Sequence, residues 1–186
     1  MISGRPERGE YADYAQSDID YVAGDDAIAA LTAQGEHVVA LLSSLGNVDG
    51  LTYAPGKWTL KEVVGHLIDD ERIFAYRLLC VARADRRPLP GFEENEYVAS
   101  TFFEQRPLAS LINEYRSVRA ATITLLDGLT AEEWTRRGIV NGYEASVRGL
   151  AFHIAGHELH HLRTITSRYL PTTRTSAPDS ADPATA

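Results

Sequence analysis

The residues in this sequence whose types and spacing best suit chemistry are histidines. The chain has six, and four of them fall in one short stretch: His153, His157, His160 and His161. Two residues four apart on a helix differ by about 40° in direction and about 6 Å in height, so their side chains share a face. Two imidazoles with that spacing can bind one metal ion through bonds of about 2.1 Å. The pairs 153/157 and 157/161 both meet this condition, and spacing alone does not choose between them.

A metal site of this kind needs a third ligand from another part of the chain. His66 is the strongest candidate, because it interrupts the otherwise apolar run VVGHLI. His37 competes with it, although it follows Gly35 and Glu36 in a more polar stretch. A single buried histidine is usually a hydrogen-bonded core residue. The histidine cluster together with His66 nevertheless favours a divalent metal site over packed core histidines.

Residues 157–161 also read literally as H-E-x-x-H, the motif of zinc peptidases in which the glutamate is a general base. Those enzymes need a third ligand, a glutamate or histidine, further along the chain. No histidine or glutamate follows His161 in this sequence. We therefore do not expect a zinc peptidase.

The elements that must position these histidines are predicted to be four long helices. Apolar residues recur at spacings of three and four over residues 25–45, from 59 to before Pro88, over 107–128 and over 146–170. Thr59 and Glu62 form a capping box at the start of the second segment, and another begins at Thr130. We find no alternation strong enough to predict a β-strand. Four amphipathic helices of this length predict an all-α fold, a four-helix bundle.

The two ends of the chain differ from the middle. Residues 1–24 are polar but contain Tyr11, Tyr14 and Tyr21, and aromatic rings seldom remain unpacked. We expect this segment to be an arm packed on the bundle, which covers residues 25–170. Residues 171–186 are rich in Pro, Ser, Thr and Ala, so we expect a disordered tail there.

Composition limits the partners and the location of the protein. The formal net charge is −8 and the isoelectric point about 5.2, which argues against nucleic-acid binding. No apolar run is long enough to cross a bilayer, and the N-terminus lacks the apolar core of a secretory signal. We therefore expect a cytoplasmic protein without a membrane partner. The single cysteine, Cys80, excludes an intrachain disulfide and a cysteine-based zinc site.

Three stretches carry a resemblance to a known family. They are YAPGKWTLKEVVGHLIDDERIFAYRLL from Tyr53, LPGFEENEYV from Leu89 and SVRGLAFHIAGHELHHL from Ser146. In these stretches the chain resembles the DinB-like family, and within it the YfiT-like group of metal-dependent hydrolases and thiol transferases. The resemblance implies a four-helix bundle of the DinB/YfiT type with a long crossover connection, and it suggests a homodimer.

The resemblance also implies a ligand set. The family holds its metal with one histidine of the second helix and two of the fourth, which correspond here to His66, His157 and His161. It thereby selects the pair 157/161 and leaves His153 without an assigned role. The implied metal is zinc or nickel, with iron as a further candidate.

Three neutral imidazoles leave a divalent ion with an open position, the arrangement of a catalytic site. The ion could activate a water molecule, or it could bind a low-molecular-weight thiol as its thiolate. Because relatives in the family transfer thiols, we expect transfer of such a thiol to an electrophilic small molecule. Hydrolysis by a metal-bound water is the alternative, and a non-catalytic metal-binding stress protein is the second alternative.

Three further residues lie close to the expected ligands in the sequence. His160 and Glu158 are candidate acid/base groups, and Asp70, one turn beyond His66, is a candidate to orient a ligand imidazole. A packed core histidine and solvated or ion-paired carboxylates are the competing interpretations.

Overall fold

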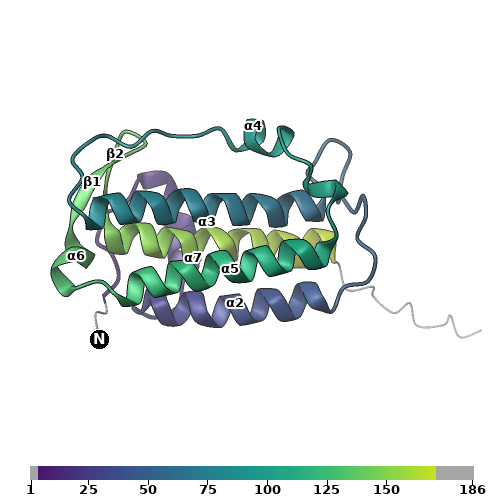
Figure 1. Ribbon diagram of the computed structural model, residues 1–186, viewed down its shortest axis with the longest axis horizontal. Coiled ribbons are helices and arrows are strands. Elements are labelled where there is room, and N and C mark those ends of the chain that lie inside the picture. Colours follow the sequence, from purple (N-terminus) through teal and green to yellow (C-terminus); the bar gives the residue numbers. More distant parts are fainter. Residues whose placement is uncertain (1–3, 171–186) are drawn as a thin grey trace, which may run out of the picture.

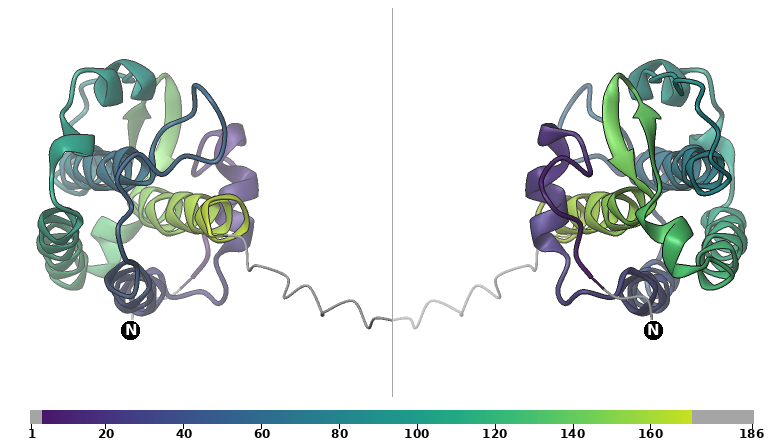
Figure 2. Two further views of the ribbon diagram at one scale, coloured as in Figure 1. Left: turned by 90° about the vertical axis from the view of Figure 1, so that its right-hand side faces the viewer. Right: turned by 90° about the vertical axis from the view of Figure 1, so that its left-hand side faces the viewer.

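Four long helices form the body of the protein. The computed structural model describes residues 4–170, and the expected disorder of residues 171–186 lies outside them. The long helices are α2 (Ala27–Ser43), α3 (Leu60–Ala82), α5 (Leu108–Asp127) and α7 (Val147–Thr164). They pack side by side as a bundle in which α3 and α2 each contact both α5 and α7 (Figures 1 and 2). The predicted fold class is therefore confirmed.

A capping box marks the start of two of the helices. At the start of α3 the Thr59 side chain accepts from the Glu62 backbone, and the Glu62 carboxylate accepts from the Thr59 backbone, as the sequence predicted. The same reciprocal pair starts the short helix α6 (Ala131–Thr135). At the end of the bundle where α3 begins, a single π-helical turn, Ile165–Tyr169, continues α7, and the Tyr169 hydroxyl donates to the Trp58 carbonyl. The two capping boxes fix where α3 and α6 begin.

A long connection crosses the whole length of the bundle between α3 and α5. Residues 83–107 run back along the outside of α3 and contain the short helix α4 (Glu94–Ala99) and a 3-10 turn, Phe103–Gln105 (Figure 1). As a result α3 and α5 point in the same direction, and α2 and α7 run opposite to them. The crossover implied by the family resemblance is present.

A small β-hairpin precedes α7, and the prediction of no strand was wrong. Strands β1 (Arg137–Val140) and β2 (Tyr143–Ser146) pair antiparallel. Between them Asn141 and Gly142 have φ angles of 52° and 80°, the left-handed geometry of a tight hairpin turn. Each strand has only four residues, too few for alternation to stand out. The Asn-Gly pair was the available signal.

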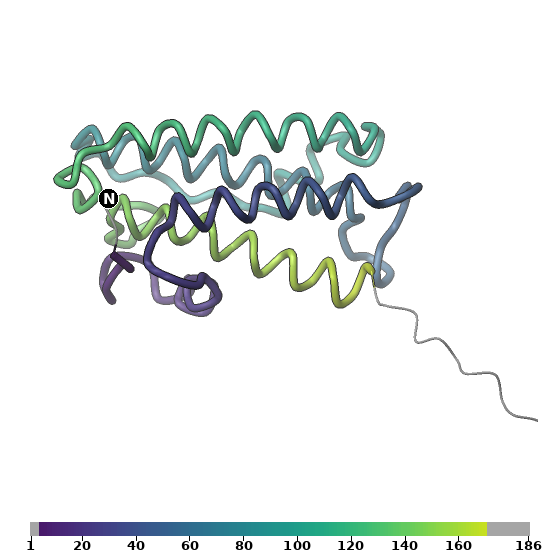
Figure 3. Tube along the Cα trace, turned by 90° about the horizontal axis from the view of Figure 1, so that it is seen from below, coloured from purple at the N-terminus to yellow at the C-terminus, as the bar shows by residue number. Residues whose placement is uncertain are grey.

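The N-terminal segment lies along α7 (Figure 3). It forms a 3-10 turn, Asp13–Ala15, followed by helix α1 (Gln16–Tyr21). A Cβ atom on Gly156 of α7 would lie 2.3 Å from the Asp18 carbonyl oxygen, so only glycine permits this approach. Upstream, the buried Glu10 carboxylate accepts hydrogen bonds from Ser146 and Arg148. These contacts hold the segment beside the histidine-bearing face of α7.

A polar layer divides the apolar core in two. On α3, one apolar cluster uses buried residues between 60 and 68, and the other uses buried residues between 74 and 82. The other three long helices divide in the same way. Between the clusters lie Gln34, His66, Asp70, Glu71, Arg119, His157 and Glu158. The candidate site is one side of this layer.

Candidate metal centre

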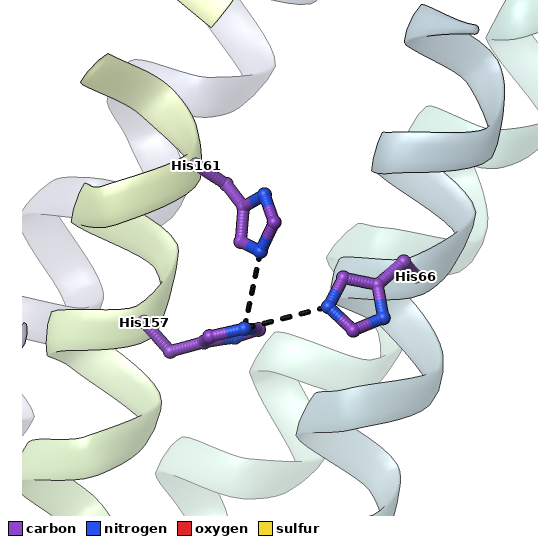
Figure 4. Close-up of side chains that lie close together, drawn as sticks. All are labelled: His66, His157 and His161. Carbon is purple, nitrogen blue, oxygen red and sulfur yellow. Dashed lines mark hydrogen bonds between the residues drawn. The ribbon is translucent and has the colours of Figure 1, made fainter. Parts of the chain in front are cut away.

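Three of the predicted histidines converge between α3 and α7. The His157 Nε2 atom lies 3.4 Å from His66 Nε2 and 3.1 Å from His161 Nε2 (Figure 4). One ring nitrogen from each of the three residues lies within 4.8 Å of the other two. Nitrogens bound at about 2.1 Å to one tetrahedral ion stand about 3.4 Å apart, so this spacing fits a shared divalent ion.

Asp70 orients the central histidine of this group. Its Oδ2 lies 3.1 Å from His157 Nδ1, which directs the lone pair of Nε2 toward the other two rings. Burial would raise the pKa of Asp70, but the neighbouring His157 holds that pKa at about 2. Asp70 is therefore an ionised acceptor, and the structure brings it to the position that the sequence suggested.

The other two histidines lie in surroundings that disfavour a charge. Burial, followed by the charge of His157, lowers the pKa of His66 to about 4 and that of His161 to about 2. For His157, burial acts in the same direction, but Asp70 outweighs it and raises the pKa. Metal binding requires neutral imidazoles, and at pH 7 two of the three already meet that condition.

A polar cavity opens beside His161, one of the three converging histidines. It has a volume of about 420 Å³, and His161 and His160 form part of its wall. The Trp58 ring packs on His66 with ring centroids 5.0 Å apart and borders the same cavity. Lys57 and Arg168 are among its other lining residues. The cavity can therefore admit a small polar molecule beside His161.

The two residues predicted as acid/base groups take different positions. His160 lies on the cavity wall, half-exposed, with its Nδ1 3.3 Å from Asp18 Oδ1 of α1. Glu158 is buried in the polar layer, where it accepts hydrogen bonds from Arg119 and Tyr115. The structure therefore brings His160 to the site but does not bring Glu158 to it.

The two competing histidines lie outside the group of three. His37 is exposed on α2. His153 is buried and stacks on Phe74 with ring centroids 4.2 Å apart, and its ring lies parallel to His157 at 5.8 Å. Of the two spacings that the sequence allowed, the structure brings the pair 157/161 together with His66.

Two residues at this site were missed by reasoning from the sequence. Glu94 of α4 places Oε2 4.0 Å from His66 Nε2, and Trp58 supplies the ring against His66. Both come from segments outside the long helices, so helical periodicity could not find them. Their only signal was their presence in the stretches that carry the family resemblance.

The comparison with known families now identifies the class of this protein. The model of the DinB superfamily matches residues 50–165, which is more than half of the chain. The chain therefore belongs to the DinB superfamily. Within residues 4–170, every helix is too short or too polar to traverse a lipid bilayer.

A sequence relative and two solved structures are similar to the chain. A protein of Oceanobacillus iheyensis named "putative metal-dependent hydrolase" is 27% identical over 117 residues, 61% of this chain. The match spans 66% of that relative, slightly less than two thirds of its length. YfiT from Bacillus subtilis, described as a "probable metal-dependent hydrolase with an unusual four-helix bundle topology", superposes with a TM-score of 0.66. Its identity is 14%, and the match covers 88% of this chain and 91% of YfiT.

The second solved structure is the mycothiol-dependent maleylpyruvate isomerase. It gives a TM-score of 0.61 at 13% identity and covers 73% of this chain but 57% of the isomerase. At these identities both structures show a shared fold. The four-helix bundle of the YfiT type, expected from the sequence, is confirmed.

Proposed function

We propose that this chain is a metal-dependent enzyme whose divalent ion is held by His66, His157 and His161. The observation that carries the proposal is the convergence of three Nε2 atoms, two of the separations being 3.4 and 3.1 Å, beside a cavity. The oriented imidazole of His157 and its Asp70 partner fit the same role. Zinc and nickel suit this nitrogen set, as does iron.

We propose that the reaction is transfer of a low-molecular-weight thiol to an electrophilic small molecule. A divalent ion at this site supplies the positive charge that favours the thiolate form. In this proposal His160, whose Nδ1 lies 3.3 Å from Asp18 Oδ1, accepts the thiol proton. The sulfur then forms a bond to carbon while the leaving group departs with the bonding electrons. Lys57 and Arg168 on the cavity wall suit a thiol that carries a carboxylate.

Hydrolysis is the second candidate, and the name of the Oceanobacillus relative favours it. The same three histidines would serve, with a water molecule as the nucleophile in place of the thiol. A non-catalytic metal-binding stress protein is the third candidate. A fourth protein ligand would support that alternative, and Glu94, whose Oε2 lies 4.0 Å from His66 Nε2, is a candidate for this role.

The remaining parts of the proposal concern the setting of the protein. On the family resemblance, we propose a homodimer. We also propose a cytoplasmic enzyme that acts on small molecules. The net charge of −8 argues against nucleic acid as its substrate.

Parallel assays on metal-loaded, untagged protein distinguish the candidates. For transfer, cysteine, glutathione or coenzyme A is supplied with monochlorobimane, which becomes fluorescent when sulfur replaces chloride. For hydrolysis, 4-nitrophenyl acetate is supplied without a thiol. The proposal expects thiol transfer that His157→Ala abolishes. Ester cleavage alone would favour the hydrolase, and inactivity of the loaded protein in both assays would favour the non-catalytic alternative.

A further inference from the structure

Arg77 is a buried cation with few partners. It lies eleven residues beyond His66 on α3, which places both on one face of the helix, and it is 4% exposed. One hydrogen bond serves the guanidinium: Nη2 donates to the Pro90 carbonyl at 2.7 Å. Among residues 4–170, no carboxylate lies within 4.0 Å of it. A buried charge is costly unless paired, so this guanidinium has unused capacity to bind an anion.

Aromatic rings surround this guanidinium. Its central carbon lies 4.7 Å from the centroid of Phe74 and 5.6 Å from that of Phe92. Tyr97 of α4 packs edge-on against Phe92, with centroids 5.1 Å apart. Cation–π contacts of this kind hold the planar fork in place without consuming its N–H donors.

A cavity of about 310 Å³ lies next to Arg77, between α3 and the crossover. Arg77, Phe92 and Tyr97 line it, together with Arg72. Arg72 is already paired with Glu114 at 2.6 Å and with Asp69 at 3.6 Å. The volume is close to the lower limit for small-molecule sites. Of the two arginines in its wall, Arg72 is paired with carboxylates and Arg77 is not.

We propose that this cavity binds a small planar carboxylate, with Arg77 gripping the carboxylate and Phe92 and Tyr97 flanking the ring or double bond. Guanidinium presents two parallel N–H groups that match the two oxygens of a carboxylate, and aromatic walls suit a flat, unsaturated body. A series of rings connects this cavity with the metal centre. Phe74, beside Arg77, stacks on His153 at 4.2 Å, and His153 lies 5.8 Å from His157. These rings separate the cavity from the metal centre, so the binding claim does not depend on the proposed reaction.

The test uses the cinnamate anion and its neutral amide, cinnamamide, as matched probes of one shape. Each is titrated into full-length protein and followed by calorimetry and by the Arg Nε–H resonances in a nitrogen–proton NMR spectrum. We expect saturable binding of cinnamate, at least tenfold weaker binding of cinnamamide, and a shift of the Arg77 resonance. Arg77→Met should weaken cinnamate binding at least tenfold, and Arg77→Lys should retain part of it. Arg72→Met, the control on the same wall, should leave it within about twofold.

The outcomes separate this inference from the proposed function. His157→Ala should lose metal yet still bind cinnamate, because Arg77 and its rings remain. Equal binding of the two probes, or no saturable binding of cinnamate to the wild-type protein, would overturn the inference. If Arg77→Met fails to fold, the comparison of the two probes on wild-type protein and on Arg77→Lys decides it. If Arg77 had only a structural role, both substitutions would lower the melting temperature. The wild-type protein would then bind cinnamate no more tightly than cinnamamide.

Discussion

At the scale of single residues, the pair of Asp70 and His157 shows how a neighbouring group prepares a ligand. The carboxylate accepts from Nδ1 at 3.1 Å and so points Nε2 at the other two histidines. Asp70→Asn removes the charge while keeping the shape of the side chain. We expect it to lower metal affinity by about 10- to 100-fold, as loss of such orienting partners does. Competition with a chromophoric chelator measures the affinity, and Asp69→Asn, on the half-buried neighbour, is the control.

A second prediction at this scale concerns which histidines bind. His157→Ala should abolish stoichiometric metal, because it removes the ring nearest to both others. His153→Ala should leave the metal content largely intact, since that ring stacks on Phe74 instead. Elemental analysis of both variants checks the pair. The reverse pattern would show that the pair 153/157 is the one in use.

The sequence predicted the candidate metal ligands in part. The spacing of four between histidines predicted that they share one helix face. His66 was found because it is an isolated polar residue in an apolar run. Spacing could not choose between His153 and His161, because that choice depends on how α7 is rotated against α3. It also could not show that Glu158 faces Arg119 rather than the cavity.

At the scale of elements, a buried ion cluster connects three of the long helices. Arg119 of α5 donates to Glu71 of α3 at 2.9 Å and to Glu158 of α7 at 2.7 Å. Arg119→Met would leave two buried carboxylates without their cation. We expect the free energy of unfolding to fall by about 3–5 kcal/mol, measured by urea denaturation. Arg116→Met, on the exposed face of the same helix, should change it by less than about 0.5 kcal/mol.

The attachment of the N-terminal segment should depend on pH. Burial would raise the pKa of Glu10, but hydrogen bonds from Arg148 and Ser146 outweigh burial and hold it below its ordinary value of 4.5. Because the pKa is lowered in the folded state, this stabilisation is present above pH 4.5 and is lost as the pH falls through the folded-state pKa. Glu10→Gln should therefore lower stability by about 2 kcal/mol at pH 7, with the difference from wild type shrinking in acid.

Thermal unfolding of both proteins at pH 7 and pH 3 checks this prediction. Glu36→Gln, on an exposed residue of α2, serves as the control. A difference between wild type and Glu10→Gln that stayed constant with pH would show that the carboxylate charge has no part in holding the segment.

Among the elements, the sequence predicted the long helices better than the hairpin and the crossover. Helix α3 was predicted from its capping box and a long apolar stripe, both of which are local. The hairpin was missed because two four-residue strands carry little periodicity, although Asn141 and Gly142 signalled the turn. The path of the crossover came from the family resemblance, since its contacts join residues that are distant in sequence.

At the scale of the whole molecule, the polar layer places chemistry in the middle of an apolar bundle. Two apolar clusters hold the ends of the four helices together, and the layer between them contains the ion cluster together with His66 and His157. The crossover and the N-terminal segment cover the outer side, where Glu94 and Asp18 approach His66 and His160. The bundle thus supplies rigidity, and the two covering segments shape access to the site.

The central claim is that His66, His157 and His161 bind one divalent ion. Inductively coupled plasma mass spectrometry on untagged protein, with His66→Ala alongside, tests it most directly. After loading with excess zinc and dialysis, we expect about one equivalent of metal in the wild-type protein and its loss in the variant. Wild-type protein without metal, or a variant that keeps a full equivalent, would contradict the claim and leave these histidines as packed core residues.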